Sequence, residues 1–218
     1  MTFMIKKAVL PVAGLGTRIL PMTKEMPKEM LPIFLRSVNG KPCLKPMVQA
    51  IFEQLYDVGI REFGFIVGRG KRIIEDHFTP DLNFVRYLEK KGKNELAKEL
   101  KEFYRRIFNS TIVFINQPEP KGFGDAVLKA KSFINEPFLV HAGDTYILSN
   151  NHDHLKKLMK VFEQFKADVA LLVQEVDDPR IYGVIEGEEE SEGIYRVYKA
   201  VEKPKEPPTN LAIMPVYI

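Results

Sequence analysis

Residues 7–18 read Lys-Ala-Val-Leu-Pro-Val-Ala-Gly-Leu-Gly-Thr-Arg, an apolar run that leads into a glycine-containing turn. A short continuous apolar run predicts a strand that is covered on both faces, as in parallel sheets. The glycines allow backbone N–H groups to face a bound anion, and Arg18 adds a charge suited to phosphate oxygens. The third glycine of a dinucleotide site and the Gly-Lys-Ser/Thr of a P-loop are missing, so an ordinary glycine turn remains the alternative.

Strand-like and helix-like segments alternate through most of the chain, which predicts a mostly parallel sheet between helices. The strand-like runs occupy 7–12, 62–67, 111–115, 137–141 and 168–173. The amphipathic helical patterns occupy 46–58, 95–107, 125–133 and 154–165. Near the end, apolar runs at 182–185 and 194–201 flank the acidic stretch 186–192, which predicts a β-hairpin with a solvated loop.

Composition excludes several classes of protein. The 218 residues carry 32 Lys+Arg against 29 Asp+Glu, and a net charge of +3 is too small a bias to indicate a nucleic-acid binder. The single cysteine excludes an internal disulfide framework and a cysteine-based zinc cluster. The aliphatic stretch 169–173 is too short to cross a bilayer, so no membrane role is expected. Lys6 and Lys7 before an apolar run resemble a signal peptide, but Pro11 and Arg18 favour a buried strand, and we expect a cytoplasmic protein.

A second motif, Pro27-Lys-Glu-Met-Leu-Pro32, follows the glycine turn. Its two prolines restrict the backbone, so we expect a stiff loop that presents Lys28 and Glu29. A lysine near a glycine turn suits a phosphate, and a glutamate can accept a hydrogen bond from a base N–H. Two solvated charges are the alternative for this motif taken alone.

Together these motifs resemble the sugar-1-phosphate nucleotidyltransferases, and most closely the uridylyltransferase branch. Three later segments agree in order. They are Gln117 with Gly122-Phe-Gly-Asp-Ala-Val127, then Gly143-Asp144, then Tyr182-Gly-Val184 with Val201-Glu-Lys-Pro204 and Asn210-Leu-Ala-Ile213. The helical segment 81–108 lies where this branch has a longer insertion than the thymidylyltransferases. The resemblance implies a Rossmann-like α/β fold, with a mixed, mostly parallel sheet and helices on both faces.

The resemblance also implies a role for each matching residue. The nucleotide is expected to lie against the backbone of Ala13, Gly14, Gly16 and Thr17. The base is expected to be read by Glu29 and Gln117, with Gly122 leaving room for it. Arg18 and Lys28 are the expected catalytic residues, because they hold triphosphate oxygens, and Asp144 is the expected Mg²⁺ ligand. The sugar phosphate is expected to contact Gly183, Glu202 and Lys203.

The implied reaction joins UTP and glucose 1-phosphate to give UDP-glucose and pyrophosphate. Both reactants are anions, so a catalyst must neutralise charge and align an in-line attack at the α-phosphorus. No nucleophilic serine or cysteine and no histidine base is required, because the attacking phosphate is already ionised. Asp144 as a simple turn cap, and Glu202–Lys203 as an exposed charge pair, are the alternatives for these residues taken alone.

The resemblance covers residues 1–218 as a single domain, with a nucleotide-binding half at 1–150 and a sugar-binding half at 151–218. The family continues beyond the position of Ile218, and that part brings a further aspartate for Mg²⁺. We therefore expect either a short homologue or a fragment, which binds nucleotide and turns over slowly or not at all. A thymidylyltransferase, a transferase for another sugar phosphate and a non-catalytic nucleotide-sugar binding module remain alternatives, and homo-oligomer formation is left open.

Overall fold

The computed structural model describes residues 5–218 as ten strands, six α-helices and several 3₁₀ turns. The strands are β1 (Lys7–Pro11), β2 (Pro32–Arg36), β3 (Pro42–Pro46), β4 (Glu62–Val67), β5 (Thr111–Asn116), β6 (Leu139–His141), β7 (Leu171–Glu175), β8 (Gly183–Ser191), β9 (Ile194–Glu202) and β10 (Leu211–Tyr217). The helices are α1 (Met47–Asp57), α2 (Arg72–His77), α3 (Leu82–Lys90), α4 (Asn94–Phe108), α5 (Phe123–Lys129) and α6 (Asp153–Phe165). Two 3₁₀ turns, η1 (Thr17–Ile19) and η2 (Lys28–Met30), follow β1.

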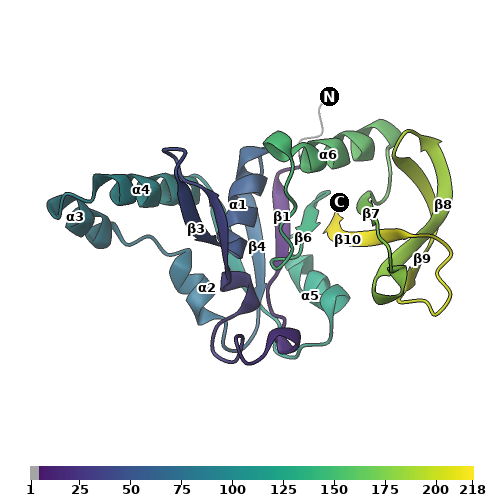
Figure 1. The fold of residues 1–218 in the computed structure, drawn as a ribbon, viewed down its shortest axis with the longest axis horizontal. Helices are drawn as coiled ribbons and strands as arrows, with labels where there is room; N and C mark the ends of the chain where they lie inside the picture. The colour runs from purple at the N-terminus through teal and green to yellow at the C-terminus, as the bar shows by residue number, and fades with distance from the viewer. Residues whose placement is uncertain (1–4) are drawn as a thin grey trace.

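The main sheet has the strand order β5-β4-β1-β6-β10-β8-β9, with β7 pairing beside β10. The first four strands are parallel, and β10 then pairs antiparallel with β6, β7 and β8. The expected mixed α/β sheet is therefore confirmed. Because β10 pairs with β6, the two expected halves of the chain share one continuous sheet, which Figure 1 shows from the parallel strands to β8 and β9.

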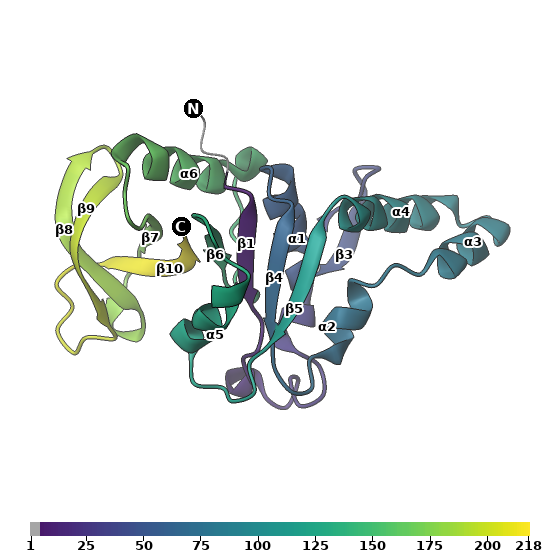
Figure 2. The same cartoon turned by 180° about the vertical axis from the view of Figure 1, so that it is seen from behind.

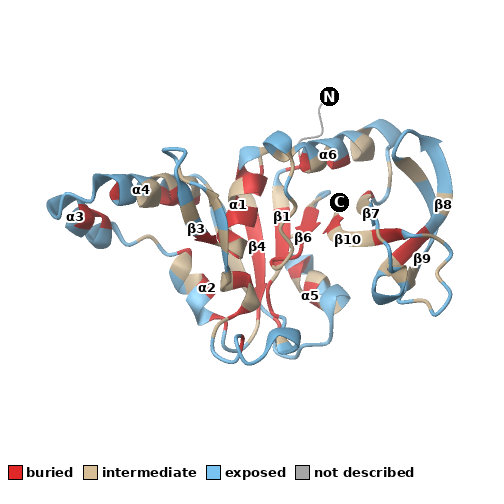
Figure 3. Cartoon of the chain, viewed as in Figure 1, coloured by how far each residue is buried: buried red, intermediate tan, exposed pale blue. Residues whose placement is uncertain are grey.

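Helices cover both faces of the parallel strands, as the sequence predicted. Alternate residues of β1 point to opposite faces, so Ala8 and Leu10 pack with α1, α2 and α4, whereas Val9 packs with α5. Phe52 of α1 is fully buried against Phe63, with ring centroids 4.6 Å apart. Figure 3 shows this burial concentrated in α1, β1, β4 and β6. This core fixes the carboxyl ends of the parallel strands, where the loops after β1, β4 and β5 gather (Figure 2).

The helical segment expected at 81–108 consists of two helices, α3 and α4. Gly92, with φ 71°, lies between α3 and α4, because a left-handed residue ends a helix at little steric cost to glycine. The hairpin β2–β3, which the sequence patterns did not reveal, is linked to α4 through Lys45 and Glu99, 2.8 Å apart. Within residues 5–218, no helix has the length and apolar character needed to cross a membrane.

The solvated loop expected at 186–192 is wrong, because β8 continues through Ser191. Its glutamates face basic residues of β9: Glu186 is opposite Lys199, and Glu188 is opposite Arg196. Opposite charges on facing strands stabilise a ladder that like charges alone would disfavour. Gly187 stands at a register shift, where an added Cβ would overlap the Arg196 carbonyl oxygen.

The sequence also misplaced strands around β10. The strand expected at 168–173 lies at 171–175, and β10 itself was read only as a sugar-side motif. Pro215 lies inside β10, which normally argues against a central strand. A register shift between Ile213 and Tyr217 accommodates the proline, whose carbonyl oxygen accepts a hydrogen bond from Ala142 N at 2.9 Å.

His141 at the end of β6 makes the stability of the protein depend on pH. Its side chain is fully buried, and burial lowers its pKa from 6.5 to about 4. Between pH 6.5 and pH 4, His141 therefore binds a proton in the unfolded chain but not in the folded chain. The free energy of unfolding falls as the pH drops through this range. At pH 5 we expect His141 to contribute a loss of about 2 kcal/mol relative to pH 7, since each tenfold difference in proton affinity between the two states corresponds to about 1.4 kcal/mol. Burial also lowers the pKa of His77 from 6.5 to about 4, so His77 adds a further loss over the same range.

Urea unfolding at pH 7 and pH 5 measures this loss, with His141→Gln as the control because it does not titrate. Nδ1 of His141 lies 2.9 Å from the Ala142 carbonyl oxygen, and a glutamine amide can donate to the same acceptor. The variant is expected to lose about 2 kcal/mol less between the two pH values than the unmodified chain. An equal loss in both proteins would show that another group controls the acid transition.

Candidate active site

The glycine turn after β1 contains one glycine in a left-handed conformation. Gly16 has φ 69°, a left-handed conformation that favours glycine, and Thr23 Oγ1 donates a 2.7 Å hydrogen bond to its carbonyl oxygen. Ala13 is buried, whereas Gly14 and Thr17 are exposed. Arg18, in η1, is also exposed at this edge. The backbone of the turn is therefore held by a hydrogen bond, and several of its residues are exposed at the carboxyl end of β1.

Lys28 and Asp144, 116 positions apart in the chain, form an ion pair beside this turn. Lys28 belongs to η2, and Asp144 follows β6, so both reach the same edge of the sheet. Gly14 lies directly against this pair, because a Cβ added to it would be 3.3 Å from Lys28 Nζ. Both side chains are partly exposed, which leaves them open to a ligand. The fold thus brings together three of the predicted site residues.

Glu29 does not lie on an exposed loop, as the sequence suggested, but in the interior. It is 1% exposed, and its Oε2 lies 2.8 Å from Nζ of Lys71, which is 6% exposed. Burial raises the pKa of the Glu29 carboxyl, and the Lys71 ammonium opposes this shift. Within η2, the Lys28 side chain is partly exposed and the Glu29 side chain is buried. The flanking prolines in the sequence do not show this difference.

Lys71 is a residue that the sequence reasoning missed. It follows Gly68-Arg-Gly70, the short turn after β4. Gly68 packs against the glycine turn, since an added Cβ would be 3.3 Å from the Ala13 carbonyl oxygen. Two glycines and a lysine directly after a parallel strand could have pointed to Lys71, because the loops after such strands form the ligand-binding edge of the sheet.

Gln117 follows β5, and its side-chain amide is held in one orientation. The side chain is 4% exposed, and its Nε2 donates to Asp125 Oδ2 at 2.6 Å and to the Gly122 carbonyl oxygen at 3.3 Å. Its backbone N–H donates to the Val67 carbonyl oxygen at 2.7 Å. The amide donor lowers the pKa of the Asp125 carboxyl, so this group is ionised at neutral pH. With both amide hydrogens directed at protein oxygens, Oε1 is the atom left for a ligand.

The residues predicted to hold the sugar phosphate gather where β8 and β9 pair. Gly183 is opposite Glu202, and a Cβ on this glycine would be 3.0 Å from Glu202 Oε2. Lys203 Nζ lies 2.8 Å from Glu202 Oε1, and the Lys203 N–H donates to the Tyr182 carbonyl oxygen. Lys203 has φ 43°, which is strained for a residue with a side chain. Both charged side chains are exposed, so the pair adds little stability by itself.

A divalent cation fits the carboxylate side of this edge. Asp144 Oδ2 is taken by Lys28, and Oδ1 receives only a long 3.5 Å contact from Thr145 Oγ1. Among residues 5–218 no three His, Cys, Asp or Glu side chains gather as a preformed metal site. Mg²⁺ often binds through one or two carboxylates together with substrate phosphates, so a single partly exposed aspartate at a phosphate-binding edge suits it.

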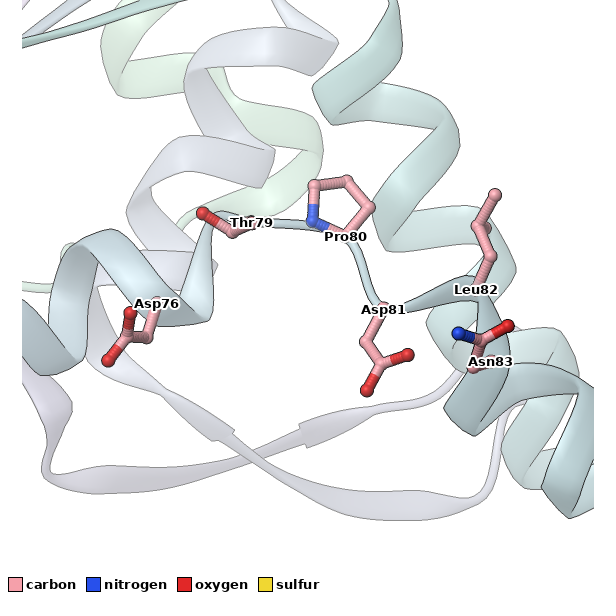
Figure 4. A pocket seen from close by; sticks show the side chains of 6 residues that line it. All are labelled: Asp76, Thr79, Pro80, Asp81, Leu82 and Asn83. Atoms are coloured by element: carbon pink, nitrogen blue, oxygen red, sulfur yellow. The ribbon is translucent and has the colours of Figure 1, made fainter.

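Two cavities lie near the loops of this region. One, of about 490 Å³, is next to the carboxyl ends of β4 and β5 and is lined by Gly68, Arg69 and Asn116, among others. The other, of about 380 Å³, lies between α2 and α3, and Figure 4 shows Asp76 and Asp81 at its edges. None of the predicted site residues lines either cavity. The second cavity carries Asp76 and Asp81. Its two carboxylates repel phosphate, so the nucleotide is not expected there.

A substitution at Gly143 measures how tightly the turn that carries Asp144 is packed. A Cβ at this buried position would overlap Val12 Cγ1 and approach Glu29 Cγ to 3.3 Å. Gly143→Ala is therefore expected to destabilise the fold by about 1–3 kcal/mol, as overpacked core positions do. Displacing Asp144 is also expected to lower turnover about tenfold, because small misplacements of catalytic groups are costly. Urea unfolding and initial rates measure the two effects.

Gly124→Ala is the matched control for this change. An added Cβ there meets no atom within 4 Å, and the residue lies in α5. Alanine is the better helix former, so the control is expected to be neutral or stabilising by up to about 1 kcal/mol. Equal rates and stabilities for the two variants would contradict close packing under Asp144.

Comparisons with known proteins identify a family and similar solved structures. The family model described as nucleotidyl transferase matches residues 7–218. A UTP–glucose-1-phosphate uridylyltransferase of Pseudomonas aeruginosa is 42% identical over 222 residues, covering 99% of this chain and 75% of the relative.

Two solved structures extend the likeness to the fold. A UDP-glucose pyrophosphorylase complexed with UDP-glucose matches with a TM-score of 0.79 at 34% identity, covering 98% of this chain and 75% of that one. A UTP-bound UGPase from Acinetobacter baumannii matches with a TM-score of 0.83 at 30% identity, covering 99% of this chain and 74% of that one.

Proposed function

Because the chain belongs to the nucleotidyl transferase family, we propose that the edge formed by Gly14, Lys28 and Asp144 is where it transfers a uridylyl group. Its relatives and structural neighbours include UTP–glucose-1-phosphate uridylyltransferases and UDP-glucose pyrophosphorylases. The chain makes UDP-glucose and pyrophosphate from UTP and glucose 1-phosphate. One observation supports this location: the Lys28 ammonium and the Asp144 carboxylate meet beside Gly14, which has no side chain.

The reaction needs little covalent chemistry from the protein. A phosphate oxygen of glucose 1-phosphate attacks the α-phosphorus of UTP and forms a new P–O bond. The bond from that phosphorus to the bridging oxygen breaks, and pyrophosphate leaves with the electron pair. Lys28 and Arg18 are proposed to hold the triphosphate oxygens, because fixed positive charges offset the negative charge that gathers there. The open backbone of Gly14 and Gly16 lets the phosphates approach without meeting a side chain.

The family generally uses a divalent metal ion, and we propose Mg²⁺ held by Asp144. Held there by Asp144, the ion would neutralise part of the negative charge of the phosphates. In the free protein Lys28 neutralises the Asp144 carboxylate. A bound triphosphate offers Lys28 a different set of anionic partners, which releases the carboxylate for the cation.

The sugar side is proposed to use Lys203 and Glu202. The Lys203 ammonium suits the phosphate of glucose 1-phosphate, and the Glu202 carboxylate accepts hydrogen bonds from sugar hydroxyls. The strained backbone of Lys203 supports this proposal, since residues held in rare conformations concentrate at functional sites. Gly183 leaves the Glu202 carboxylate accessible by having no side chain beside it.

The base contact is proposed to rest on Gln117, with Gly122 leaving space for the ring. Glu29 has almost no exposed surface. We therefore infer that it acts indirectly, by pairing with Lys71 and supporting the turn that carries Lys28.

Pyrophosphate release by this 218-residue chain tests the proposed function. We expect release only when UTP, glucose 1-phosphate and a divalent metal are all present, and UDP-glucose as the second product. Replacing UTP by dTTP is a further arm of the same assay. Faster turnover with dTTP would point to a thymidylyltransferase, and stable UTP binding with no pyrophosphate would point to a non-catalytic binding module.

A further inference from the structure

The amide of Gln117 is held in place by a carboxylate that has no assigned role. Asp125 lies in the first turn of α5, eight residues after Gln117, and its Oδ2 accepts the 2.6 Å hydrogen bond from Gln117 Nε2. Its other oxygen lies 3.4 Å from Lys129 Nζ, one helical turn further on. An ionised carboxylate only accepts hydrogen bonds, so it fixes which end of the amide faces it.

Because the hydrogens on Gln117 Nε2 are directed at protein oxygens, Oε1 is the atom of the amide that could accept a hydrogen bond from a ligand. The Gly122 carbonyl oxygen, 3.3 Å from Nε2, is a second acceptor on the same nitrogen. Turning the amide over would bring Oε1 against these two oxygens, three acceptors with no hydrogen between them. The energetic penalty of that contact keeps the amide in one orientation.

Two pyrimidine bases differ at the atom that such an oxygen would meet. Uracil has an N–H at position 3 and offers a donor. Cytosine has a bare nitrogen there and offers an acceptor. An amide oxygen held toward the base therefore binds uracil and repels cytosine, because two facing acceptors leave both unpaired.

We propose that Asp125 is a positioning residue that selects uracil over cytosine by fixing the orientation of the Gln117 side-chain amide. The inference rests on the proposed function of this edge as the nucleotide site. Asp125 does not contact the base in this scheme; it acts through Gln117. The lowered pKa of its carboxyl is consistent with an acceptor that remains ionised throughout the neutral range.

The test is the Asp125→Asn variant, measured with UTP and with CTP. Asparagine has nearly the same shape, but its amide nitrogen can donate to Gln117 Oε1 and so permits the turned-over amide. We expect the ratio of kcat/KM for UTP to that for CTP to fall at least about tenfold, the equivalent of one hydrogen bond. Asp125→Glu keeps a carboxylate and is expected to retain a strong preference for UTP.

Asp153→Asn is the matched control. Asp153 is also in the first turn of a helix, and Lys157 lies 3.3 Å from it one turn on, as Lys129 does for Asp125. The control removes the same helix-end charge and the same type of ion pair. Its UTP-to-CTP ratio is expected to match that of the unmodified chain.

Equilibrium binding separates this inference from the proposed function. If the unmodified chain released no pyrophosphate, the transferase proposal would fail, but calorimetric dissociation constants for UTP and CTP would still test Asp125. A UTP-to-CTP affinity ratio in Asp125→Asn equal to that of the unmodified chain would overturn the inference. A fall in stability or rate that leaves this ratio unchanged would also overturn it, because it would show a merely structural role.

Discussion

Replacing Asp144 by Asn is expected to lower kcat for pyrophosphate release by about 10²–10³-fold, the loss typical when one preorganised electrostatic group is removed. The substitution keeps the shape of the side chain and removes its charge, so the turn at Gly143 has no steric reason to change. Lys28 loses its ion-pair partner but still faces the phosphate-binding edge. The expected defect is therefore in metal-dependent turnover and not in folding.

The sign of the effect on UTP binding distinguishes this role from a structural one. Without metal, the Asp144 carboxylate repels the triphosphate, so Asp144→Asn is expected to bind UTP at least as tightly as the unmodified chain. With Mg²⁺, the unmodified chain gains affinity and the variant does not. Calorimetric titration with UTP, in Mg²⁺ and in EDTA, measures both quantities.

Asp76→Asn serves as the control for this experiment. Asp76 is also an exposed carboxylate beside a cation, 3.8 Å from Arg72, but it lies at the α2–α3 cavity. Exposed ion pairs contribute up to about 1 kcal/mol, so the control is expected to leave turnover unchanged. Unchanged, metal-dependent turnover in Asp144→Asn would refute the metal assignment.

Periodicity predicted the parallel part of the fold well, because buried strands and amphipathic helices have distinct spacings. The strand expected at 62–67 is β4 without error, and the helix expected at 46–58 is α1 within a residue at each end. Prediction failed where long-range pairing decides the structure. The acidic stretch 186–192 continues as part of β8, paired along β9 with Lys199 and Arg196 opposite two of its glutamates. No local pattern in the sequence contains that information.

In the candidate site, too, local motifs could be predicted from the sequence, whereas contacts between distant segments could not. The glycine turn and the Gly-Asp after β6 are local motifs, and their positions could be predicted. The burial of Glu29 against Lys71 could not, since it depends on the turn after β4 reaching under η2. Likewise, the orientation of the Gln117 amide depends on Asp125 and the Gly122 carbonyl oxygen, which only the folded loop places together.

Lys203→Met is expected to raise KM for glucose 1-phosphate by about 10- to 100-fold, because a charge-assisted hydrogen bond to phosphate contributes about 1.5–3 kcal/mol. Methionine keeps most of the length of the side chain and removes the charge. The Lys203 N–H that bonds to the Tyr182 carbonyl oxygen belongs to the backbone, so the local fold retains that contact. The dissociation constant for UTP is expected to change less than about twofold, because the proposed UTP ligands lie on other segments.

Lys205→Met is the control that separates the loss of a positive charge from the loss of a contact made at position 203. Lys205 is exposed and two residues away, so both variants lower the net charge of the same segment equally. General electrostatic attraction of glucose 1-phosphate would make the two variants equal, and the effect would fade with salt. A specific contact makes Lys203→Met far worse than Lys205→Met at every salt concentration.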